Sequence, residues 1–183
     1  MHAVVVYESM FGNTEQIASG IAAGLEAAGA TTATVDVGRL EPDDLAGCGL
    51  LVVGAPTHAF SLSRASTRED AVRQGADPAR AVTGVREWLT TVDAAFPRLE
   101  DRPRVAVFDT RAQKVRRLPG SAGRAARVLR ACGFTVVDRA TFLVLDVKGP
   151  LAAGELDRAR EWGAALGTGA GAVGDRDRHD HRG

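Results

Sequence analysis

Short apolar runs alternate along the chain with segments in which apolar residues recur every three or four positions. A strand covered on both faces of a parallel sheet carries apolar side chains at successive positions, so the runs predict buried strands. The second run alternates apolar and polar residues, and the fifth is interrupted at Asp138 and Arg139. The five predicted strands cover residues 3–7, 32–37, 50–53, 104–108 and 134–145.

The segments between these runs predict helices. Ile17, Ile21 and Leu25 recur at helical spacing. Asn13 and Gln16 match the pattern of a capping box at the start of this helix. Similar patterns predict a short helical segment from residue 42 and helices over residues 85–92, 121–132, where Ser121 is the expected cap, and 156–166. Strands that alternate with helices in this way predict an α/β fold, a parallel sheet covered on both faces with right-handed crossovers.

Two segments lack this periodicity. Residues 59–82 are rich in Ser, Thr, Arg and Gly and predict a long loop, and loops of that length in compact domains are usually functional or disordered. Residues 167–183 end in a charged run without apolar side chains and predict a disordered tail. We therefore expect one domain over residues 1–166, with His179 and His181 of the tail solvated and not bound to a metal.

Composition narrows the function classes. The chain has 183 residues, of which 45% are hydrophobic and 25% charged, as in an ordinary globular domain. Its 23 basic and 23 acidic residues cancel, so no overall field favours nucleic acid or an anionic membrane. No apolar stretch is long enough for a membrane span and no secretory signal precedes the first strand, so a cytoplasmic location is expected. Cys48 and Cys132 are too far apart in sequence to suggest a metal or redox pair and are expected to be packed thiols.

The end of the first strand carries the clearest chemical signal. Ser9, Gly12 and Thr14 lie where this strand turns into the first helix. A helix N-terminus leaves backbone N–H groups unpaired and favours negative charge, so this junction predicts an anion site. The turn has neither the Gly-Lys-Ser/Thr ending of a P-loop nor three glycines of a dinucleotide fingerprint, which favours a monophosphate.

Two loops bear a specific resemblance. Residues 7–15, YESMFGNTE, resemble the FMN-phosphate loop of the flavodoxin family, and residues 54–58, GAPTH, resemble its loop beside the isoalloxazine ring. The Ser-Met-aromatic-Gly form of the first loop is also similar to the flavodoxin-like quinone reductases. The resemblance covers the chain to about Leu166. It implies a doubly wound, five-stranded parallel sheet of order 2-1-3-4-5 in three α/β/α layers, with FMN between the ends of strands one and three, as in flavodoxin itself.

The resemblance also implies which residues hold FMN. The phosphate would be held, largely through backbone N–H groups, by Ser9, Met10, Phe11, Gly12, Asn13 and Thr14. The ring would be bordered by Pro56, Thr57, His58 and Phe60, and approached on its other side by a turn that begins with Asp109, Thr110 and Arg111. No residue has the pattern of a dedicated acid, base or nucleophile, and His58 is the candidate to tune or protonate the reduced flavin. Trp88 and Trp162 are expected in the core, not on the flavin.

The chain departs from many electron-shuttling flavodoxins, which enclose the ring with Trp and Tyr and present an acidic rim. Its only tyrosine, Tyr7, belongs to the first strand. The segment after Phe108 carries four basic residues and no aromatic one; the basic residues are Arg111, Lys114, Arg116 and Arg117. Positive charge near a flavin favours its anionic reduced form and raises the reduction potential, so a very low-potential shuttle is disfavoured.

These observations leave three function classes. The first is an FMN-binding redox protein that transfers electrons through the flavin, with a redox partner protein or as an NAD(P)H-dependent reductase of quinones or similar acceptors. In that class residues 59–82 would cover the ring and shape a pocket for a small acceptor, with a second copy of the chain completing it. The second is a flavin-free binding domain on the same fold. The third, a receiver domain, is disfavoured because strand three ends in Gly54 and Ala55, where receivers carry a phosphorylatable Asp.

Overall fold

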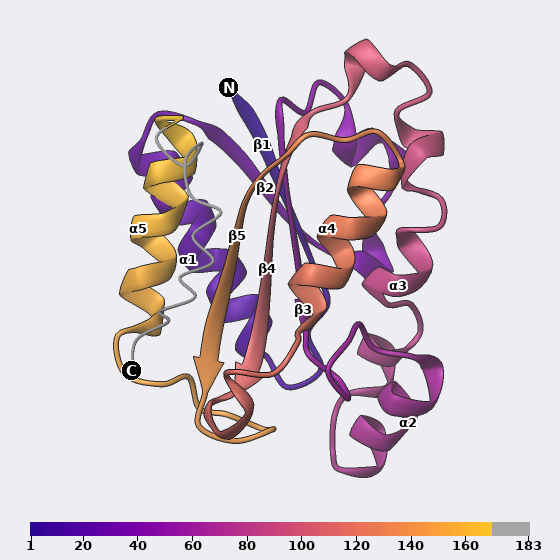
Figure 1. Ribbon diagram of the computed structural model, residues 1–183, viewed down its shortest axis with the longest axis vertical. Coiled ribbons are helices and arrows are strands. Elements are labelled where there is room, and N and C mark those ends of the chain that lie inside the picture. Colours follow the sequence, from indigo (N-terminus) through magenta and orange to yellow (C-terminus); the bar gives the residue numbers. More distant parts are fainter. Residues whose placement is uncertain (170–183) are drawn as a thin grey trace, which may run out of the picture.

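The computed structural model describes residues 1–169 and contains a single five-stranded sheet (Figure 1). All its strands are parallel, and their order is β2-β1-β3-β4-β5, which confirms the expected α/β class and strand order. The strands are β1 (His2–Tyr7), β2 (Thr31–Asp36), β3 (Leu50–Pro56), β4 (Arg104–Ala112) and β5 (Val136–Val144). Most of the predicted tail, including His179 and His181, lies outside the described residues.

Helices cover both faces of the sheet. In Figure 1, α1 (Asn13–Ala27) and α5 (Glu155–Gly167) lie side by side on one face, and α3 (Val85–Trp88) and α4 (Ser121–Ala131) lie on the other. The remaining helix, α2 (Ala65–Arg73), lies at the end of the molecule where the strands point their carboxyl ends. Short 3-10 segments complete the connections: Val37–Arg39, Pro42–Leu45, Pro78–Ala81, Val92–Ala95, Leu99–Asp101 and Gln113–Val115.

The core follows from the alternation of side chains along the central strands. Val4 and Val6 of β1 face the α3 and α4 layer, whereas Ala3 and Val5 face α1 and α5, and all four are fully buried. This two-sided burial explains why β1 and β3 are continuous apolar runs.

Glycines let α1 and α5 approach closely. A Cβ built on Gly24 would lie 2.0 Å from the carbonyl oxygen of Arg160, and one built on Gly163 would lie 2.1 Å from that of Ile21. Any larger residue would force the two helices apart, so the packing of this layer depends on both positions.

Both tryptophans pack in or against the core, as the sequence predicts. Trp162 packs edge-on against Phe108 and Phe142, and its Nε1 donates a hydrogen bond to Asp138 at 2.8 Å. Trp88 packs partly buried against the core on the opposite face. The cysteines are likewise free thiols, and burial raises the pKa of Cys48 to about 11.

Several predicted boundaries were wrong. Residues 59–82 are not a continuous loop, because they contain α2 and the 3-10 turn Pro78–Ala81. The helix α2 has no apolar stripe that a sequence pattern could detect; instead it buries Arg68, whose guanidinium finds partners elsewhere in the fold. Conversely, the helix predicted over residues 85–92 is only Val85–Trp88, followed by a 3-10 turn.

The predicted helix caps were also wrong. Gly12, with a left-handed φ of 83°, occupies the N-cap of α1, and Asn13 is the first helical residue. Gly120 occupies the N-cap of α4, and the hydroxyl of Ser121 donates a 2.9 Å hydrogen bond to the carbonyl of Ala55. Both helices therefore begin on glycine, and their free N–H groups remain available to groups from other elements.

Candidate functional site

A cavity of about 320 Å³ opens at the carboxyl ends of β1, β3 and β4. Every predicted site residue except Gly12 and Asp109 lines it. The predicted residues on its wall are Ser9, Met10, Phe11, Asn13, Thr14, Pro56, Thr57, His58, Phe60, Thr110 and Arg111. The volume is within the range of about 300 to 1,000 Å³ that is typical of small-molecule sites.

The loop between β1 and α1 forms one wall and is built to hold an anion. Among the described residues, no group accepts a hydrogen bond from the backbone N–H groups of residues 10–14. Gly12 does not line the cavity, but its left-handed backbone turns the chain into the 15-residue helix α1, at whose N-terminus these N–H groups gather. Unpaired amides at a long helix N-terminus fit one phosphate group.

Two threonine hydroxyls connect this loop to β4. Thr14 and Thr110 form a 2.8 Å hydrogen bond between their Oγ1 atoms, and both side chains are buried. Ser9 is also buried, and its Oγ accepts a hydrogen bond from the backbone N–H of Glu15 at 3.3 Å. The hydroxyls of Ser9 and Thr14 therefore lie in fixed positions beside the unpaired amides.

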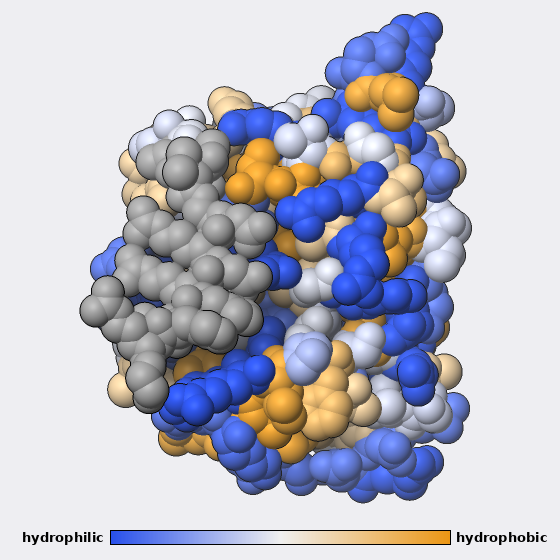
Figure 2. Space-filling view, viewed as in Figure 1, coloured by the Kyte–Doolittle hydropathy of each residue, from blue (hydrophilic) through white to orange (hydrophobic). Residues whose placement is uncertain are grey.

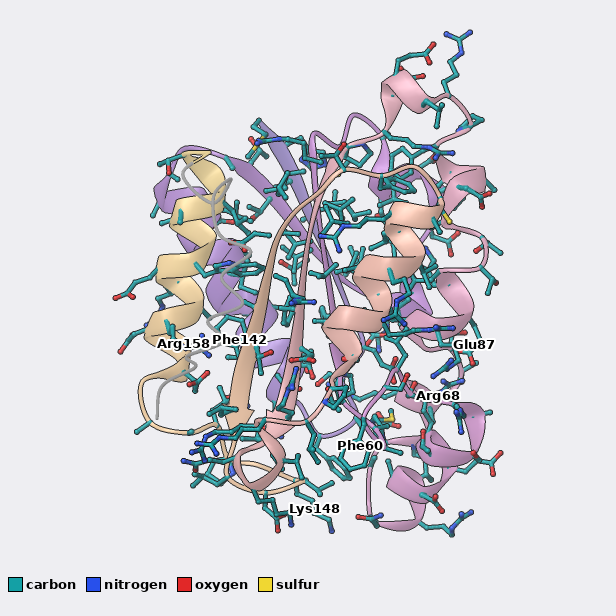
Figure 3. The ribbon with its side chains drawn as sticks, viewed as in Figure 1. Phe60, Arg68, Glu87, Phe142, Lys148 and Arg158 are labelled. Atoms are coloured by element: carbon teal, nitrogen blue, oxygen red, sulfur yellow. The ribbon has the colours of Figure 1, made fainter. Side chains whose placement is uncertain are left out.

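The opposite wall is a tight turn with unusual backbone angles. His58 and Ser61 pair through reciprocal backbone hydrogen bonds of 2.8 and 2.9 Å, and the two residues between them have positive φ angles. The φ angle is 44° at Ala59 and 64° at Phe60. Left-handed residues other than Gly, Asn or Asp are uncommon and mark sites where the backbone is constrained. The turn holds the Phe60 ring at the cavity mouth, where it is 51% exposed (Figure 3).

Apolar side chains gather around this mouth. Phe60 and Val147, which line the cavity, are exposed, and the space-filling view shows apolar residues at this end of the molecule (Figure 2). The cavity wall thus combines an anion-binding loop with an apolar rim. A flat aromatic group that carries a phosphate has these two properties.

His58 stands inside this wall as an uncharged side chain. Burial, together with the nearby positive charge of Arg68, lowers its pKa below the usual 6.5. At neutral pH the imidazole is therefore neutral, and it offers one N–H donor and one acceptor nitrogen to a neighbour.

The segment from Asp109 to Arg111 differs from the prediction. It is not a turn, because β4 continues through Ala112 and alternates its side chains between the two faces. Thr110 meets Thr14, whereas Asp109 points to the α4 side and does not line the cavity. There its carboxylate accepts hydrogen bonds from the backbone N–H of Ala122 at 3.1 Å and from Thr57 Oγ1 at 3.1 Å.

Asp109 thereby caps α4 from a neighbouring strand. It is fully buried, and its Oδ2 lies 2.7 Å from the guanidinium of Arg111, whose side chain is 10% exposed. Carboxylate charge is favourable at a helix N-terminus. Asp109 is therefore a positioning residue that fixes Arg111 and α4.

Six cavity residues were missed by the sequence analysis. Val144 and Val147 come from the end of β5 and the loop after it, a segment that has neither a glycine-rich nor an aromatic signal. Ala112 ends β4, and Lys114 and Val115 follow it, so these three could have been found by extending the predicted segment beyond Arg111. The missed residues are Ala59, Ala112, Lys114, Val115, Val144 and Val147.

The positive charge around the cavity is smaller than the sequence suggested. Arg111 is paired with Asp109, and Lys114 Nζ lies 3.3 Å from Asp146 on the loop after β5. Two of the four basic residues expected to raise the reduction potential therefore have an acidic partner.

The segment 59–82 is anchored beside the cavity by buried charge. Arg68 is 2% exposed; it donates hydrogen bonds to the carbonyl of Ala81 and to Ser63 Oγ and forms a 3.1 Å ion pair with Glu87 (Figure 3). Nearby, Glu8 accepts a 2.9 Å hydrogen bond from the backbone N–H of Val85 through Oε2. Among the described residues, Oε1 of Glu8 has no partner.

Arg80 ties the same segment to the anion-binding loop. Its guanidinium lies 2.7 Å from Glu15 and donates to the carbonyl oxygen of Ser9 at 3.3 Å. The segment therefore packs against the outside of that loop, and its first residues, Ala59 and Phe60, line the cavity.

Neither a metal centre nor a membrane span was found within residues 1–169. No group of three or more His, Cys, Asp or Glu side chains is arranged to hold a metal ion in that part of the chain. The helices described there are all too short or too polar to cross a bilayer.

Comparisons with known proteins agree with this geometry. Residues 5–79 match the model of the flavodoxin family. A flavodoxin from the domain Archaea superimposes with a TM-score of 0.62 at 18% identity, covering 92% of this chain and 98% of that one. Comparison with curated protein sequences gives no match.

Two further solved structures share the fold. The flavodoxin of Megasphaera elsdenii gives a TM-score of 0.59 at 22% identity over 88% of this chain and 98% of its own. A WrbA-like flavodoxin from Agrobacterium tumefaciens gives 0.60 at 17% identity over 92% of this chain and 96% of its own. Identities this low show a shared fold, and the family match covers the strand and loop that carry the anion site.

Replacing Asp109 with Asn should destabilise the protein strongly. The substitution keeps the shape of the side chain but leaves the buried Arg111 guanidinium without its carboxylate, which costs about 3 kcal/mol of unfolding free energy. Asp70→Asn breaks an exposed ion pair with Arg73 and should cost less than about 1 kcal/mol. Urea unfolding of both variants measures the difference, and equal losses would contradict the structural role of Asp109.

Replacing Glu8 with Gln should change how stability depends on pH. Burial raises the pKa of Glu8 above the usual 4.5, so the folded protein binds this proton more tightly than the unfolded chain does. Ionisation of Glu8 therefore lowers the unfolding free energy as pH rises above the pKa that Glu8 has in the unfolded chain. The stability of Glu8→Gln relative to the original chain should increase between about pH 4 and pH 7.

The measurement is urea unfolding at several pH values, with Glu100→Gln on the surface as the control for loss of one charge. A constant stability difference over this range would show that folding does not shift the pKa of Glu8, and a falling one would show that folding favours the carboxylate; either result contradicts the prediction.

Proposed function

The chain is a flavodoxin-like protein, and from that premise we propose that it binds FMN in the cavity at the ends of β1, β3 and β4 and transfers electrons through it. FMN is the cofactor of flavodoxins, and when bound it supplies the redox chemistry. The observation that carries the proposal is the run of unpaired N–H groups at residues 10–14 beside an apolar cavity. The phosphate of FMN needs hydrogen-bond donors, and its ring needs an apolar environment beside them.

Each wall has a separate role in this proposal. The amides of residues 10–14, with the hydroxyls of Ser9 and Thr14, would hold the phosphate. Phe60 and Pro56 would border the ring, and neutral His58 would offer it a hydrogen bond without adding charge. The described residues would contribute binding, orientation and electrostatics, and the proposal gives none of them the role of a nucleophile or metal ligand.

The exposed rim favours exchange of electrons with a partner that reaches the ring edge. Phe60 and Val147 stand at the mouth and are about half exposed, so a small acceptor or the surface of a redox protein has direct access. This arrangement supports electron transfer in general.

Thr14→Val tests the phosphate site directly. The substitution keeps the volume of the side chain and removes one hydroxyl donor, so FMN affinity should fall by about tenfold, the value of one hydrogen bond to a charged group. Riboflavin has the same ring without the phosphate, and its affinity should not change. Quenching of flavin fluorescence during titration measures both affinities.

Ser19→Ala provides the matched control. Ser19 lies on the exposed side of α1, where its hydroxyl donates to the carbonyl of Glu15, and it does not line the cavity. The control should bind FMN as the original chain does. If the original chain binds FMN no more tightly than riboflavin, the cavity does not recognise a phosphate; if neither flavin binds with saturable affinity, the chain is a flavin-free domain.

A further inference from the structure

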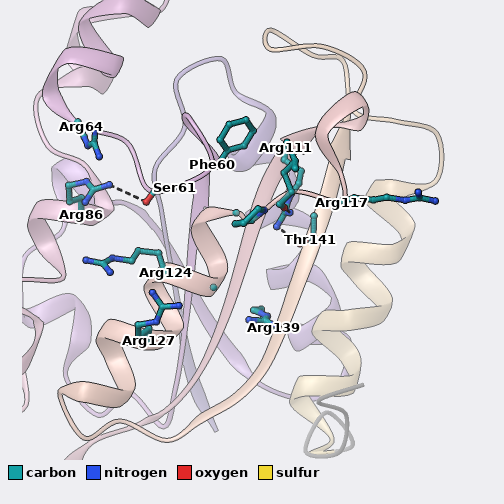
Figure 4. A pocket seen from close by; sticks show the side chains of 14 residues that line it. Phe60, Ser61, Arg64, Arg86, Arg111, Arg117, Arg124, Arg127, Arg139 and Thr141 are labelled. Atoms are coloured by element: carbon teal, nitrogen blue, oxygen red, sulfur yellow. Dashed lines mark hydrogen bonds between the residues drawn. The ribbon is translucent and has the colours of Figure 1, made fainter. Parts of the chain in front are cut away.

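A second and larger cavity lies beside the proposed flavin site. It has a volume of about 810 Å³ and shares Phe60 and Arg111 with the first cavity, so the two cavities adjoin at these residues. Its walls come from the segment after β3, from α3, β4 and β5, and from α4 with the loop before it (Figure 4). We call it the arginine groove, because seven arginines line it: Arg64, Arg86, Arg111, Arg117, Arg124, Arg127 and Arg139.

Only one of these arginines has an acidic partner among the described residues. Arg111 is paired with Asp109, and no carboxylate of residues 1–169 lies within 4.0 Å of the other six guanidinium groups. The lining residues of the groove also include no Asp or Glu. A chain with no net charge has therefore gathered positive charge in one concave place.

Arg86 shows the effect of this crowding. Its guanidinium donates to the carbonyl oxygens of Ser63 and Leu62, both at 2.6 Å, and all its partners are uncharged. The third partner is Ser61 Oγ (Figure 4). Partial burial and the charges of Arg64 and Arg124 lower the pKa of Arg86. A bound anion would relieve this repulsion, whereas water alone does so only in part.

The positions of two groove arginines suit phosphate groups. Arg124 and Arg127 are three residues apart on α4 and therefore project from the same side of the helix. A guanidinium can donate two parallel hydrogen bonds to one phosphate, which makes arginine the usual residue for phosphate recognition. Several such groups around one hollow fit an anion that carries more than one phosphate.

The shape of the site favours a small molecule over an acidic protein. A volume of about 810 Å³ is within the range of small-molecule sites, and the arginines surround a hollow instead of covering a convex surface. Phe60 and Arg111 stand at the border, so a ligand in the groove can extend to the proposed ring site.

We propose that the arginine groove binds the phosphates of a nicotinamide dinucleotide phosphate, with the nicotinamide directed past Phe60 toward the flavin cavity. The inference rests on the proposed function, because it assigns the electron donor of that same redox site. In the reaction a hydride would pass from NADPH to oxidised FMN, which gives NADP⁺ and the two-electron reduced anion of the flavin without a further reactant.

The experiment is calorimetric titration of NADP⁺ into the flavin-free and FMN-loaded protein, with NAD⁺ and inorganic pyrophosphate as comparison probes. NADP⁺ should bind both forms with saturable affinity and about tenfold or more tightly than NAD⁺, because its extra phosphate adds one charged contact. Since the flavin-free protein is included, a failure to bind FMN leaves the dinucleotide result unaffected, and the two proposals can fail separately.

Variants locate the binding. The double variant Arg124→Ala with Arg127→Ala should bind NADP⁺ about tenfold or more weakly, and its affinity for FMN should not change. The matched control is Arg98→Ala with Arg130→Ala, which removes two exposed arginines outside the groove, one of them from the same helix. It should leave both affinities unchanged and so account for any effect of total charge.

Three results would overturn the proposal. The first is no saturable binding of NADP⁺ to either form of the protein. The second is pyrophosphate or NAD⁺ binding as tightly as NADP⁺, which would make the groove an unselective anion site. The third is equal weakening by the groove pair and the control pair. Binding of an acidic protein in place of the dinucleotide would appear as the first result.

Discussion

The reversal of strand order at β1 decides where this molecule can hold a ligand. β1 lies between β2 and β3, so the connection that follows β1 crosses one face of the sheet and the connection that follows β3 crosses the other. The loops after β1 and β3 therefore separate at the carboxyl edge and leave a crevice between them. The anion-binding loop and the turn around Phe60 are its two sides, and the cavity of about 320 Å³ opens from it.

The sequence predicted the part of the site that depends on local patterns. The apolar run followed by Ser9, Gly12 and Thr14 can be recognised from the sequence alone, because the strand, the turn and the helix are each encoded within a few residues. The parallel sheet follows from the alternation of strands and helices. The five strands agree with the structure in number and type, and their boundaries differ by a few residues.

The features that the sequence did not predict depend on contacts between residues far apart in the chain. Helix α2 is held by the buried Arg68, a residue that hydrophobic periodicity counts as exposed. Asp109 was predicted near the flavin ring, but its carboxylate serves the N-terminus of α4, thirteen residues further along the chain. The arginine groove combines arginines from positions 64 to 139, which come together only when the chain folds.

Among the described residues, the structure also places more unpaired positive charge beside the proposed ring site than around it. Near the proposed ring site, Arg111 and Lys114 each have an acidic partner, so the positive field expected there is partly cancelled. Six arginines without a described acidic partner gather beside this site, in the groove that Phe60 borders. Positive charge in this protein is thus placed to attract a ligand beside the flavin site more than to change the flavin itself.

The most direct test of the central claim is to observe the amide groups of residues 10–14 by two-dimensional ¹⁵N–¹H NMR while FMN is added. Hydrogen bonds to a phosphate should move these amide protons far downfield, whereas riboflavin should move only residues around the ring, such as His58 and Phe60. Equal shifts of residues 10–14 with both flavins, or shifts confined to other parts of the chain, would contradict the account.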